Sequence, residues 1–444
     1  MSAATPCAGA PAVSSQRGRF GRLPLLAGTG FIPLGLFARL PLAMLTVGAL
    51  TLITSASGSY AIGGTAAGAV GIGSALGAPV LGALADRLGQ RSVLLVAAVL
   101  NSIAVLALIL AAYSIPGVVQ FGTAAPVFAA SLIAGASCPQ VGPLARVRWM
   151  ALTSKGSRAE NATDLDTALS YEGTADELTF VLGPALVGIL ASLVAPWLPL
   201  ALAAALTITL VPAFAVHRTQ LAVPRRAARS SSVRANLGDG PGTRLRRRAR
   251  LSAAVALPVL AMVCMGTFFG STQTALSSFS AGFTGSEIAG LLYAVMGLSS
   301  AGAALSVAYW PQTFAVTSRW LVSAGLMTGL SILLLLPSSE WTMVLVLLVL
   351  GLPVGPVMVT VFAIGGLVAP AGRLGTVMTA LASGIVAGTA IGSSIAGQLA
   401  QSQGYSAAFV VPVCSAAALF LLGAAAAVVV RQKKRIPVVE SPTE

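Results

Sequence analysis

Three acidic residues stand close together in an otherwise apolar part of the chain, and they are the side chains best suited to proton chemistry. Glu172, Asp176 and Glu177 precede the apolar run at 180–188. Positions 172 and 176 are four apart and share one face of a helix. Acidic groups at membrane depth are proton or substrate sites by default, because their burial is expensive. Burial and mutual repulsion would bring proton exchange of at least one carboxyl group into a useful pH range.

A second interpretation places these carboxyl groups in the first two turns of the helix, still in contact with water. There, negative charge favours the helix N-terminus, and Arg146 or Arg148 can pair with it. Both interpretations stay open for Glu172. Asp176 and Glu177 are the preferred candidates for proton coupling.

A short polar loop between two apolar runs reads Gly-Ala-Leu-Ala-Asp-Arg-Leu-Gly-Gln-Arg from position 82. Gly82 has no side chain, so another helix can approach closely, and Gly89 permits a tight turn. Asp86 can accept hydrogen bonds from the N-terminus of a neighbouring helix, where the macrodipole favours an anion. Arg87 and Arg91 can pair with Asp86 or with lipid phosphates.

This loop resembles the signature of the major facilitator superfamily between its second and third helices: Gly, three residues, Asp-Arg, one residue, Gly, one residue, Arg. All five fixed positions match. The resemblance implies two six-helix halves that rock about a central site, with Asp86 and Arg87 in a gate that latches the outward-facing state. The equivalent stretch of the second half, 306–319, has no Asp-Arg pair, which predicts a one-sided gate.

The fifth predicted helix carries Gly183-Pro184 and Gly188, which resemble the Gly-Pro motif of drug and proton antiporters in the same superfamily. Pro184 would kink the helix, and the glycines would let it pack closely or flex. The motif is partial and favours export over uptake. The fourth helix departs from the antiporter pattern, because Arg146 and Arg148 are expected at its cytoplasmic mouth rather than within the membrane.

Polar residues within the apolar segments are candidates for lining a substrate cavity. They are Asn101, Thr272, Gln273 and Tyr293. Most residues of this kind form hydrogen bonds between helices. Gln273 is the preferred substrate contact, because four consecutive polar residues, 271–274, must partly face a cavity or a neighbour at mid-membrane.

The elements that position these residues follow from composition. The chain has 444 residues, 56% of them hydrophobic and 9% charged, with a mean hydropathy of +0.90, whereas soluble domains have roughly 25% charged residues. Runs longer than about 18 apolar residues can cross a bilayer. They predict an all-α integral membrane protein with twelve transmembrane helices in two pseudo-symmetric six-helix bundles. The helices are expected at about 32–56, 60–85, 91–113, 122–147, 168–192, 196–217, 252–279, 285–308, 319–337, 341–366, 374–400 and 406–430.

The basic residues predict the orientation. The 26 Lys and Arg lie at both ends of the chain and in alternate loops, and cytoplasmic loops collect such residues. Arg39 is the one basic residue well inside a predicted helix, since Arg91, Arg146 and Arg319 stand at helix ends. A weak echo between 139–143 and 353–356 supports duplication. The predicted organisation is a cytoplasmic tail (1–31), a six-helix bundle (32–217), a basic cytoplasmic linker (218–251), a second six-helix bundle (252–430) and a cytoplasmic tail (431–444).

Other classes of function are disfavoured. The net charge of +14 lacks the interleaved aromatic residues that bind nucleic acid. The four cysteines are far apart and have no metal or redox spacing, and no nucleotide-binding loop is present. The residues before Arg22 have no signal-peptide pattern. We therefore expect no enzyme, cofactor or metal.

The sequence predicts a multi-pass protein of the plasma (inner) membrane, monomeric, that works by alternating access. Its expected partners are a small-molecule substrate, protons and the lipid bilayer. The leading hypothesis is proton-coupled efflux of an amphiphilic or drug-like molecule, as in drug resistance. One alternative is uptake of a sugar or other nutrient by symport. Another is a transport-inactive membrane sensor or lipid-handling protein.

Overall fold

The computed structural model describes residues 18–114, 124–154, 157–223, 241–281, 288–337 and 339–434. Every regular element in these residues is a helix. Twelve of the helical segments are long and apolar enough to cross a membrane. The predicted all-α membrane fold with twelve spans is therefore confirmed.

The first six spans use eight α-helices, because two of the spans are interrupted. The elements up to the sixth span are η2 (Arg19–Arg22), α1 (Leu23–Ala27), α2 (Phe31–Phe37), α3 (Leu40–Ser57), α4 (Tyr60–Leu88), α5 (Gln90–Tyr113), α6 (Ala125–Ala136), α7 (Val141–Leu152), α8 (Arg158–Leu193) and α9 (Leu198–Val216).

The remaining elements carry the other six spans and short 3-10 helices between them. They are η3 (Arg218–Ala222), α10 (Pro241–Ala281), α11 (Ile288–Ser306), η5 (Val307–Tyr309), α12 (Val316–Ser331), η6 (Ile332–Leu335), α13 (Glu340–Val368), α14 (Leu374–Gln403), α15 (Tyr405–Ala408) and α16 (Val410–Lys434).

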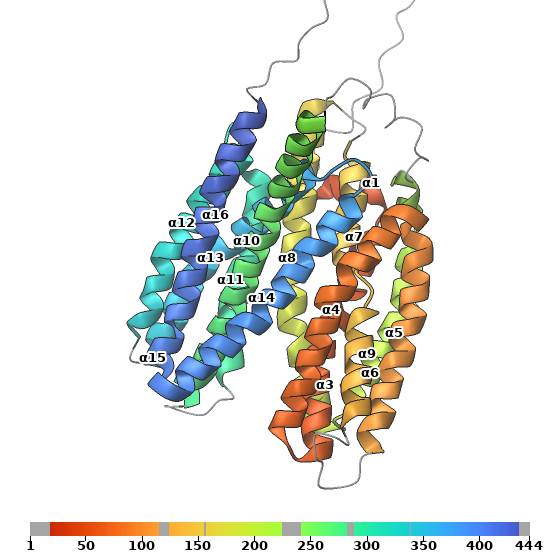
Figure 1. The fold of residues 1–444 in the computed structure, drawn as a ribbon, viewed down its shortest axis with the longest axis vertical. Helices are drawn as coiled ribbons and strands as arrows, with labels where there is room; N and C mark the ends of the chain where they lie inside the picture. Colours follow the sequence, from red (N-terminus) through yellow and green to blue (C-terminus); the bar gives the residue numbers. More distant parts are fainter. Residues whose placement is uncertain are drawn as a thin grey trace, which may run out of the picture.

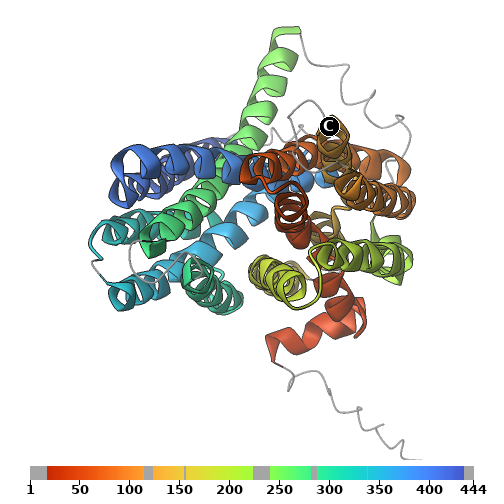
Figure 2. The same ribbon diagram turned by 90° about the horizontal axis from the view of Figure 1, so that it is seen from below.

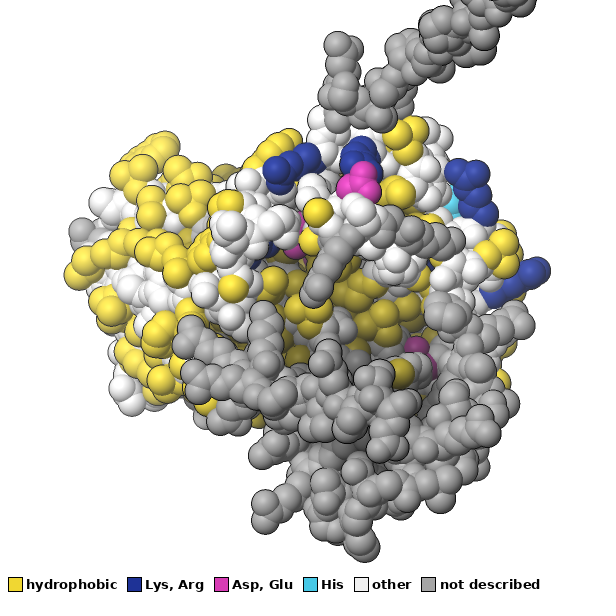
Figure 3. Space-filling model, turned by 90° about the horizontal axis from the view of Figure 1, so that it is seen from above, with side chains coloured by type: hydrophobic (Ala, Val, Ile, Leu, Met, Phe, Trp, Pro, Cys, Tyr) yellow, Lys and Arg dark blue, Asp and Glu magenta, His cyan; other side chains and the backbone are white. Residues whose placement is uncertain are grey.

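The spans form two groups that lie side by side, one from the first half of the chain and one from the second (Figures 1 and 2). We call the end that holds the α4–α5 turn, the start of α8 and η5 the Asp86 end. It lies at the top of Figure 1, where α4 and α14 meet, and the two groups diverge toward the opposite end. Arg side chains gather at the Asp86 end (Figure 3).

Equivalent helix pairs in the two groups both pack closely at a glycine. The second and fourth spans of the first group, α4 and α6, touch at Gly77, where an added Cβ would overlap the backbone of Ala136. The corresponding pair in the second group, α11 and α13, touches at Gly355, where a Cβ would overlap the carbonyl oxygen of Ser300. Small residues allow such close approach of membrane helices. This shared close packing agrees with the pseudo-symmetry expected of two six-span groups.

The echo between the fourth and tenth spans does not produce the same backbone. The fourth span is interrupted between α6 and α7 around Pro139, whereas α13 runs unbroken through Pro353 and Pro356. Gln140, at the start of α7, has a non-helical backbone and donates from Nε2 to the carbonyl of Cys138. Buried polar groups at the break are therefore satisfied locally.

Several boundaries differ from the prediction. α8 begins ten residues before the predicted start at 168, because Ser157 and Glu160 form a reciprocal capping box that starts the helix at Arg158. Residues 19–27, expected in the N-terminal tail, form η2 and α1. Much of the predicted linker and the end of the C-terminal tail, residues 224–240 and 435–444, lie outside the described residues, as does Cys7.

Candidate functional site

The carboxylate of Asp86 joins the two halves. Its Oδ1 accepts a hydrogen bond from the backbone N–H of Gly375 (2.9 Å), and its Oδ2 accepts from the N–H and the Oγ1 of Thr376 (both 2.7 Å). These donors lie in the first turn of α14, where backbone N–H groups have no partner within the helix. The anion thus sits on the positive end of the α14 macrodipole, which is the kind of contact expected for Asp86.

The glycines around Asp86 make this approach possible. A Cβ at Gly82 would overlap the Thr379 hydroxyl, and its absence lets α4 and α14 come together. Gly89 has a φ of 93°, which favours glycine, and it links α4 directly to α5. Arg87 and Arg91 are exposed, and neither forms an ion pair with Asp86. The pairing proposed for them with this carboxylate is absent in this state.

Replacing Asp86 by asparagine is expected to favour opening of the Asp86 end. Asparagine keeps one acceptor oxygen but loses the charge that the α14 N-terminus stabilises, an effect of about 1–2 kcal/mol for a partly buried group, or roughly tenfold in the equilibrium. Spin labels on the exposed positions Ala159 and Thr313, in a cysteine-free background, would measure the separation of α8 from the α11–α12 connection. Arg218→Gln, at an exposed position of η3 away from α4 and α14, is the matched control. Equal distance distributions for Asp86→Asn and parent would contradict this role.

A second polar connection joins the two halves outside the Asp86 loop. Asp166 of α8 forms an ion pair with Arg319 of α12 (2.8 Å) and accepts a hydrogen bond from Gln312 (3.0 Å). The Arg319 side chain is 2% exposed. The carboxylate comes from the first half and the guanidinium from the second. The sequence comparison between loops missed this pair, because Asp166 lies in the extra turns of α8.

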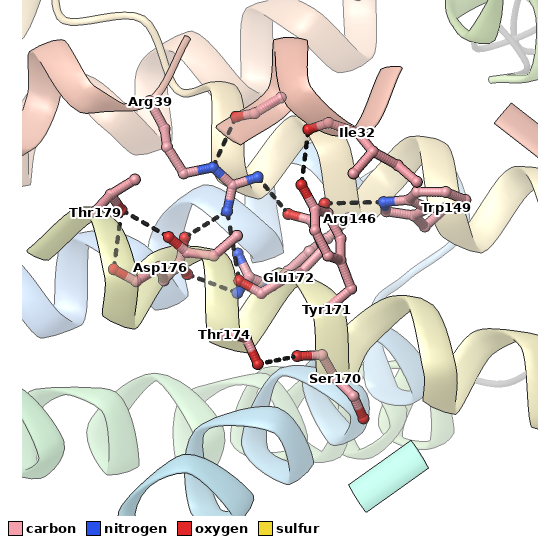
Figure 4. Close-up of polar contacts among 12 residues, drawn as sticks. Ile32, Arg39, Arg146, Trp149, Ser170, Tyr171, Glu172, Thr174, Asp176 and Thr179 are labelled. Atoms are coloured by element: carbon pink, nitrogen blue, oxygen red, sulfur yellow. Dashed lines mark hydrogen bonds and ion pairs between the residues drawn. The ribbon is translucent and has the colours of Figure 1, made fainter. Parts of the chain in front are cut away.

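The acidic residues of α8 meet two arginines inside the first half (Figure 4). Arg39 forms ion pairs with Glu172 (2.7 Å) and with Asp176 (2.8 Å). Arg146 pairs with the other oxygen of Asp176 (2.6 Å). Both guanidinium groups are nearly inaccessible, and the Asp176 side chain is 15% exposed. Two positive and two negative charges therefore neutralise one another, as buried charges require.

Further bonds fix this charge cluster to the ends of other helices. The indole Nε1 of Trp149 donates to Glu172 (2.8 Å), and the Tyr171 hydroxyl donates to the carbonyl of Ile32 (2.7 Å). Glu172 is 1% exposed. The interpretation of a water-exposed Glu172 is therefore wrong, although its pairing with an arginine was foreseen. Arg146, one of the two arginines predicted to pair with the acidic residues, pairs with Asp176, whereas Glu172 pairs with Arg39, which lies well inside a predicted helix.

Glu177 differs from its two neighbours. It is 5% exposed, and its Oε1 accepts a hydrogen bond from the hydroxyl of Ser300 on α11 (2.8 Å). Within the described chain, no Arg, Lys or His lies at ion-pair distance from it. Nearby, Thr174 donates to the carbonyl of Ala301 (3.0 Å). Glu177 is thus a buried carboxyl group at the seam between the halves, with a neutral partner.

The two arginines of the fourth span are buried. The guanidinium of Arg146 lies 3.9 Å from the ring centroid of Phe362, which belongs to α13 of the second half. Arg148 is 0% exposed and donates to Gln90 (2.8 Å) and to the carbonyl of Phe214 (2.7 Å), near the end of α9. A cation at a helix C-terminus is favourable.

The His217 side chain caps the same region. Its Nδ1 lies 3.1 Å from the Thr219 hydroxyl, and its ring packs 5.3 Å from that of Phe31. Partial burial, together with the nearby charges of Arg148 and Arg218, lowers the pKa of His217. The neutral imidazole is therefore favoured, which suits a structural residue at the end of the sixth span.

The Gly-Pro segment of α8 packs without breaking the helix. α8 continues through Pro184 to Leu193. A Cβ at Gly183 would press on Ala43 of α3, so this glycine permits close packing of the two helices. Gly188 has no atom of another element within 4 Å of its Cβ position. Only the first glycine of the motif therefore has a packing role in this state.

The four candidate cavity residues differ in burial and in hydrogen bonding. Asn101 is buried and donates to the carbonyl of Ala134 (2.7 Å), so it links α5 to α6. Thr272 is buried and its hydroxyl lacks a partner, whereas Gln273 is exposed and Tyr293 is half-buried. No hydrogen bond joins any two of these four. Among the described residues, no group of three His, Cys, Asp or Glu could hold a metal ion.

Two groups of six spans, joined at one end by polar contacts and with buried charges in the first group, are the architecture of a membrane carrier. Residues 25–382 match the model of the Major Facilitator Superfamily. The chain belongs to this superfamily and is a transporter of that fold. No curated protein matches it by sequence.

Solved structures of transporters share the fold at low identity. The chain is similar to the human organic anion transporter MFSD10 (TETRAN), with 20% identity, a TM-score of 0.62 and coverage of 92% of this chain and 100% of that one. It is also similar to a bacterial homologue of the iron transporter ferroportin in an outward-facing state (15%, 0.66, 90% and 99%). FucP, the E. coli fucose:proton symporter, matches in its outward conformation (15%, 0.58, 89% and 98%).

Proposed function

We propose that this transporter is a proton-coupled exporter of a small amphiphilic or drug-like molecule, and that Glu177 carries the proton. The observation that supports this is the contrast along α8. Glu172 and Asp176 have arginine partners, whereas Glu177 has only the Ser300 hydroxyl. An isolated carboxylate is expensive to bury, and a proton removes that charge.

The position of Glu177 suits coupling to the motion of the halves. Its hydrogen bond crosses from α8 to α11, so parting of the halves at this seam changes its surroundings. A carboxyl group that is enclosed in one state and wet in another binds its proton with different affinity in each. Such a difference is what allows a proton gradient to bias a conformational equilibrium.

We assign the charge cluster of Arg39, Arg146, Glu172 and Asp176 to a supporting role. Each carboxylate already has a cation within 2.8 Å. Protonating either one would leave a buried guanidinium without its full counter-charge, which is strongly unfavourable. The cluster therefore holds α3, α7 and α8 together while keeping its charges, and Glu177 changes its charge.

The direction of transport and the orientation in the plasma (inner) membrane also belong to this proposal. The Asp86 end carries the basic residues, and the positive-inside rule places such an end in the cytoplasm. The contacts of Asp86 and Asp166 join the halves at that end. This structure then corresponds to an outward-facing state. The partial Gly-Pro motif at Gly183 and Pro184 favours export.

Transport by purified protein in sealed vesicles tests the proposal. A panel of amphiphilic cations, neutral drug-like compounds and sugars would be offered with and without an imposed pH gradient. We expect substrate to move against the proton flow, and the movement to stop when a protonophore removes the gradient. Movement of substrate with protons would support nutrient uptake instead. Saturable binding without flux under any gradient would support a sensor.

A further inference from the structure

A short N-terminal segment lies across the seam between the two halves at the Asp86 end. We define the N-terminal strap as η2 (Arg19–Arg22) and α1 (Leu23–Ala27). Leu23 and Ala27 are 1% and 0% exposed, and α1 packs against α7 and α8. Only residues 28–30 separate the strap from the first span. One end of it is therefore built into the first half.

An ion pair orients the strap on α8. Nη2 of Arg22 lies 3.2 Å from Oδ2 of Asp164. The Arg22 side chain is 43% exposed, and exposed pairs of this kind contribute little stability on their own. The pair nevertheless directs the residues before it toward the second half.

Two strap residues make three contacts with a single short element of the second half. Arg19 donates a hydrogen bond to the carbonyl of Ala308, and its guanidinium lies 5.4 Å from the ring centroid of Tyr309. The ring of Phe20 lies 6.0 Å from the same ring at an angle of 58°. All of these partners belong to η5. A hydrogen bond, a cation–π contact and an aromatic pair thus converge on residues 308 and 309.

η5 also lies on the boundary between the halves. Val307 is 1% exposed and packs with Leu169 of α8 and Val359 of α13 in one buried cluster. When the halves part at the Asp86 end, η5 must leave α8. The strap stays with the first half, because Leu23 and Ala27 are buried there, so the contacts of Arg19 and Phe20 with η5 must break.

We infer that the N-terminal strap is a clasp that holds the Asp86 end closed and that must release η5 before this end can open. It acts on the α8–η5 seam, whereas Asp86 acts on the α4–α14 seam. It touches neither Glu177 nor the charge cluster. Any change that detaches Arg19 and Phe20 therefore favours the open state without altering the groups assigned to proton or substrate.

Distances between spin labels at Ala159 and Thr313 test this inference without any transport measurement. Arg19→Ala and Phe20→Ala would each be compared with the parent in a cysteine-free background. We expect each variant to raise the ratio of separated to closed molecules by roughly threefold to tenfold, the range that cation–π and aromatic contacts support. Arg373→Ala, an exposed arginine at the same end that lies outside the Asp86 loop and forms no hydrogen bond or ion pair with η5, is the matched control and should leave the ratio unchanged.

A cycle of Phe20→Ala, Tyr309→Ala and the double variant separates a clasp from a general loosening. Tyr309→Ala removes the contacts of both Phe20 and Arg19 with this ring, so the double variant should open little more than Tyr309→Ala alone. Full additivity, or an unchanged distance distribution in both Arg19→Ala and Phe20→Ala, would overturn the inference. The proposed proton coupling would stand in either case, because it rests on different residues and a different readout.

Discussion

Glu177→Gln is expected to abolish gradient-driven accumulation of substrate while leaving substrate binding in place. Glutamine preserves the size of the side chain and can still accept from Ser300, but it cannot release a proton. A gradient of 100 mV is worth about 2.3 kcal/mol per proton, which corresponds to a concentration ratio of about fifty at 1.36 kcal/mol per tenfold. The parent should approach such a ratio in sealed vesicles. In the variant the ratio should fall to about one.

The control for this experiment lies on the same helix. Glu160 of α8 is exposed and bonds to Ser157 in the helix cap, so Glu160→Gln should keep nearly the full ratio. Exchange of labelled for unlabelled substrate, measured without a gradient, shows whether Glu177→Gln still moves between its states. If Glu177→Gln kept a high steady-state ratio of substrate concentrations, Glu177 would not be the proton carrier. Asp176 would then be the next candidate.

Arg39→Met is expected to destabilise the folded protein by about 3–5 kcal/mol, the usual effect of removing one partner from a buried ion pair. The change leaves Glu172 without its cation and Asp176 with Arg146 alone. Unfolding of the detergent-solubilised protein by denaturant would measure the loss. Expression should fall as well, because this is a large part of the stability of a typical protein.

A compensating variant distinguishes charge imbalance from lost packing. Arg39→Met combined with Glu172→Gln removes one positive and one negative charge, and neutral replacement of both partners is far less harmful than removal of one. We expect it to recover more than half of the lost stability. Arg91→Met, at an exposed position, should change stability by less than about 0.5 kcal/mol. If Arg39→Met were as stable as Arg91→Met, the ion pairs of Arg39 would not hold the helices together.

The spans and the contact of Asp86 could be predicted because their determinants are local. A helix needs a long enough apolar run, and Gly82, Asp86 and Gly89 occupy fixed positions within one loop. The start of α8 differs from the prediction because the capping box of Ser157 and Glu160 begins the helix at Arg158. Even there, the physical cause is contained in four consecutive residues.

The partners of buried groups could not be predicted in the same way. Arg39 and Glu172 are 133 positions apart, and nothing in either helix alone indicates that they face each other. Periodicity does not help, because a membrane helix is apolar both where it faces lipid and where it faces protein. For this reason Asn101 and Gln273 were both predicted to line a cavity, although one bonds to Ala134 and the other is exposed.

The ring of Phe362 covers the guanidinium of Arg146 from the opposite half of the molecule. Whenever the halves separate at the Asp86 end, this ring withdraws and the arginine meets water. Attraction between charges weakens severalfold as the local dielectric constant rises. The ion pairs of Arg146 and Arg39 with Asp176 should therefore be strong while the Phe362 ring covers Arg146, and weaker once the ring withdraws. The rigidity of the first half should then change within each transport cycle.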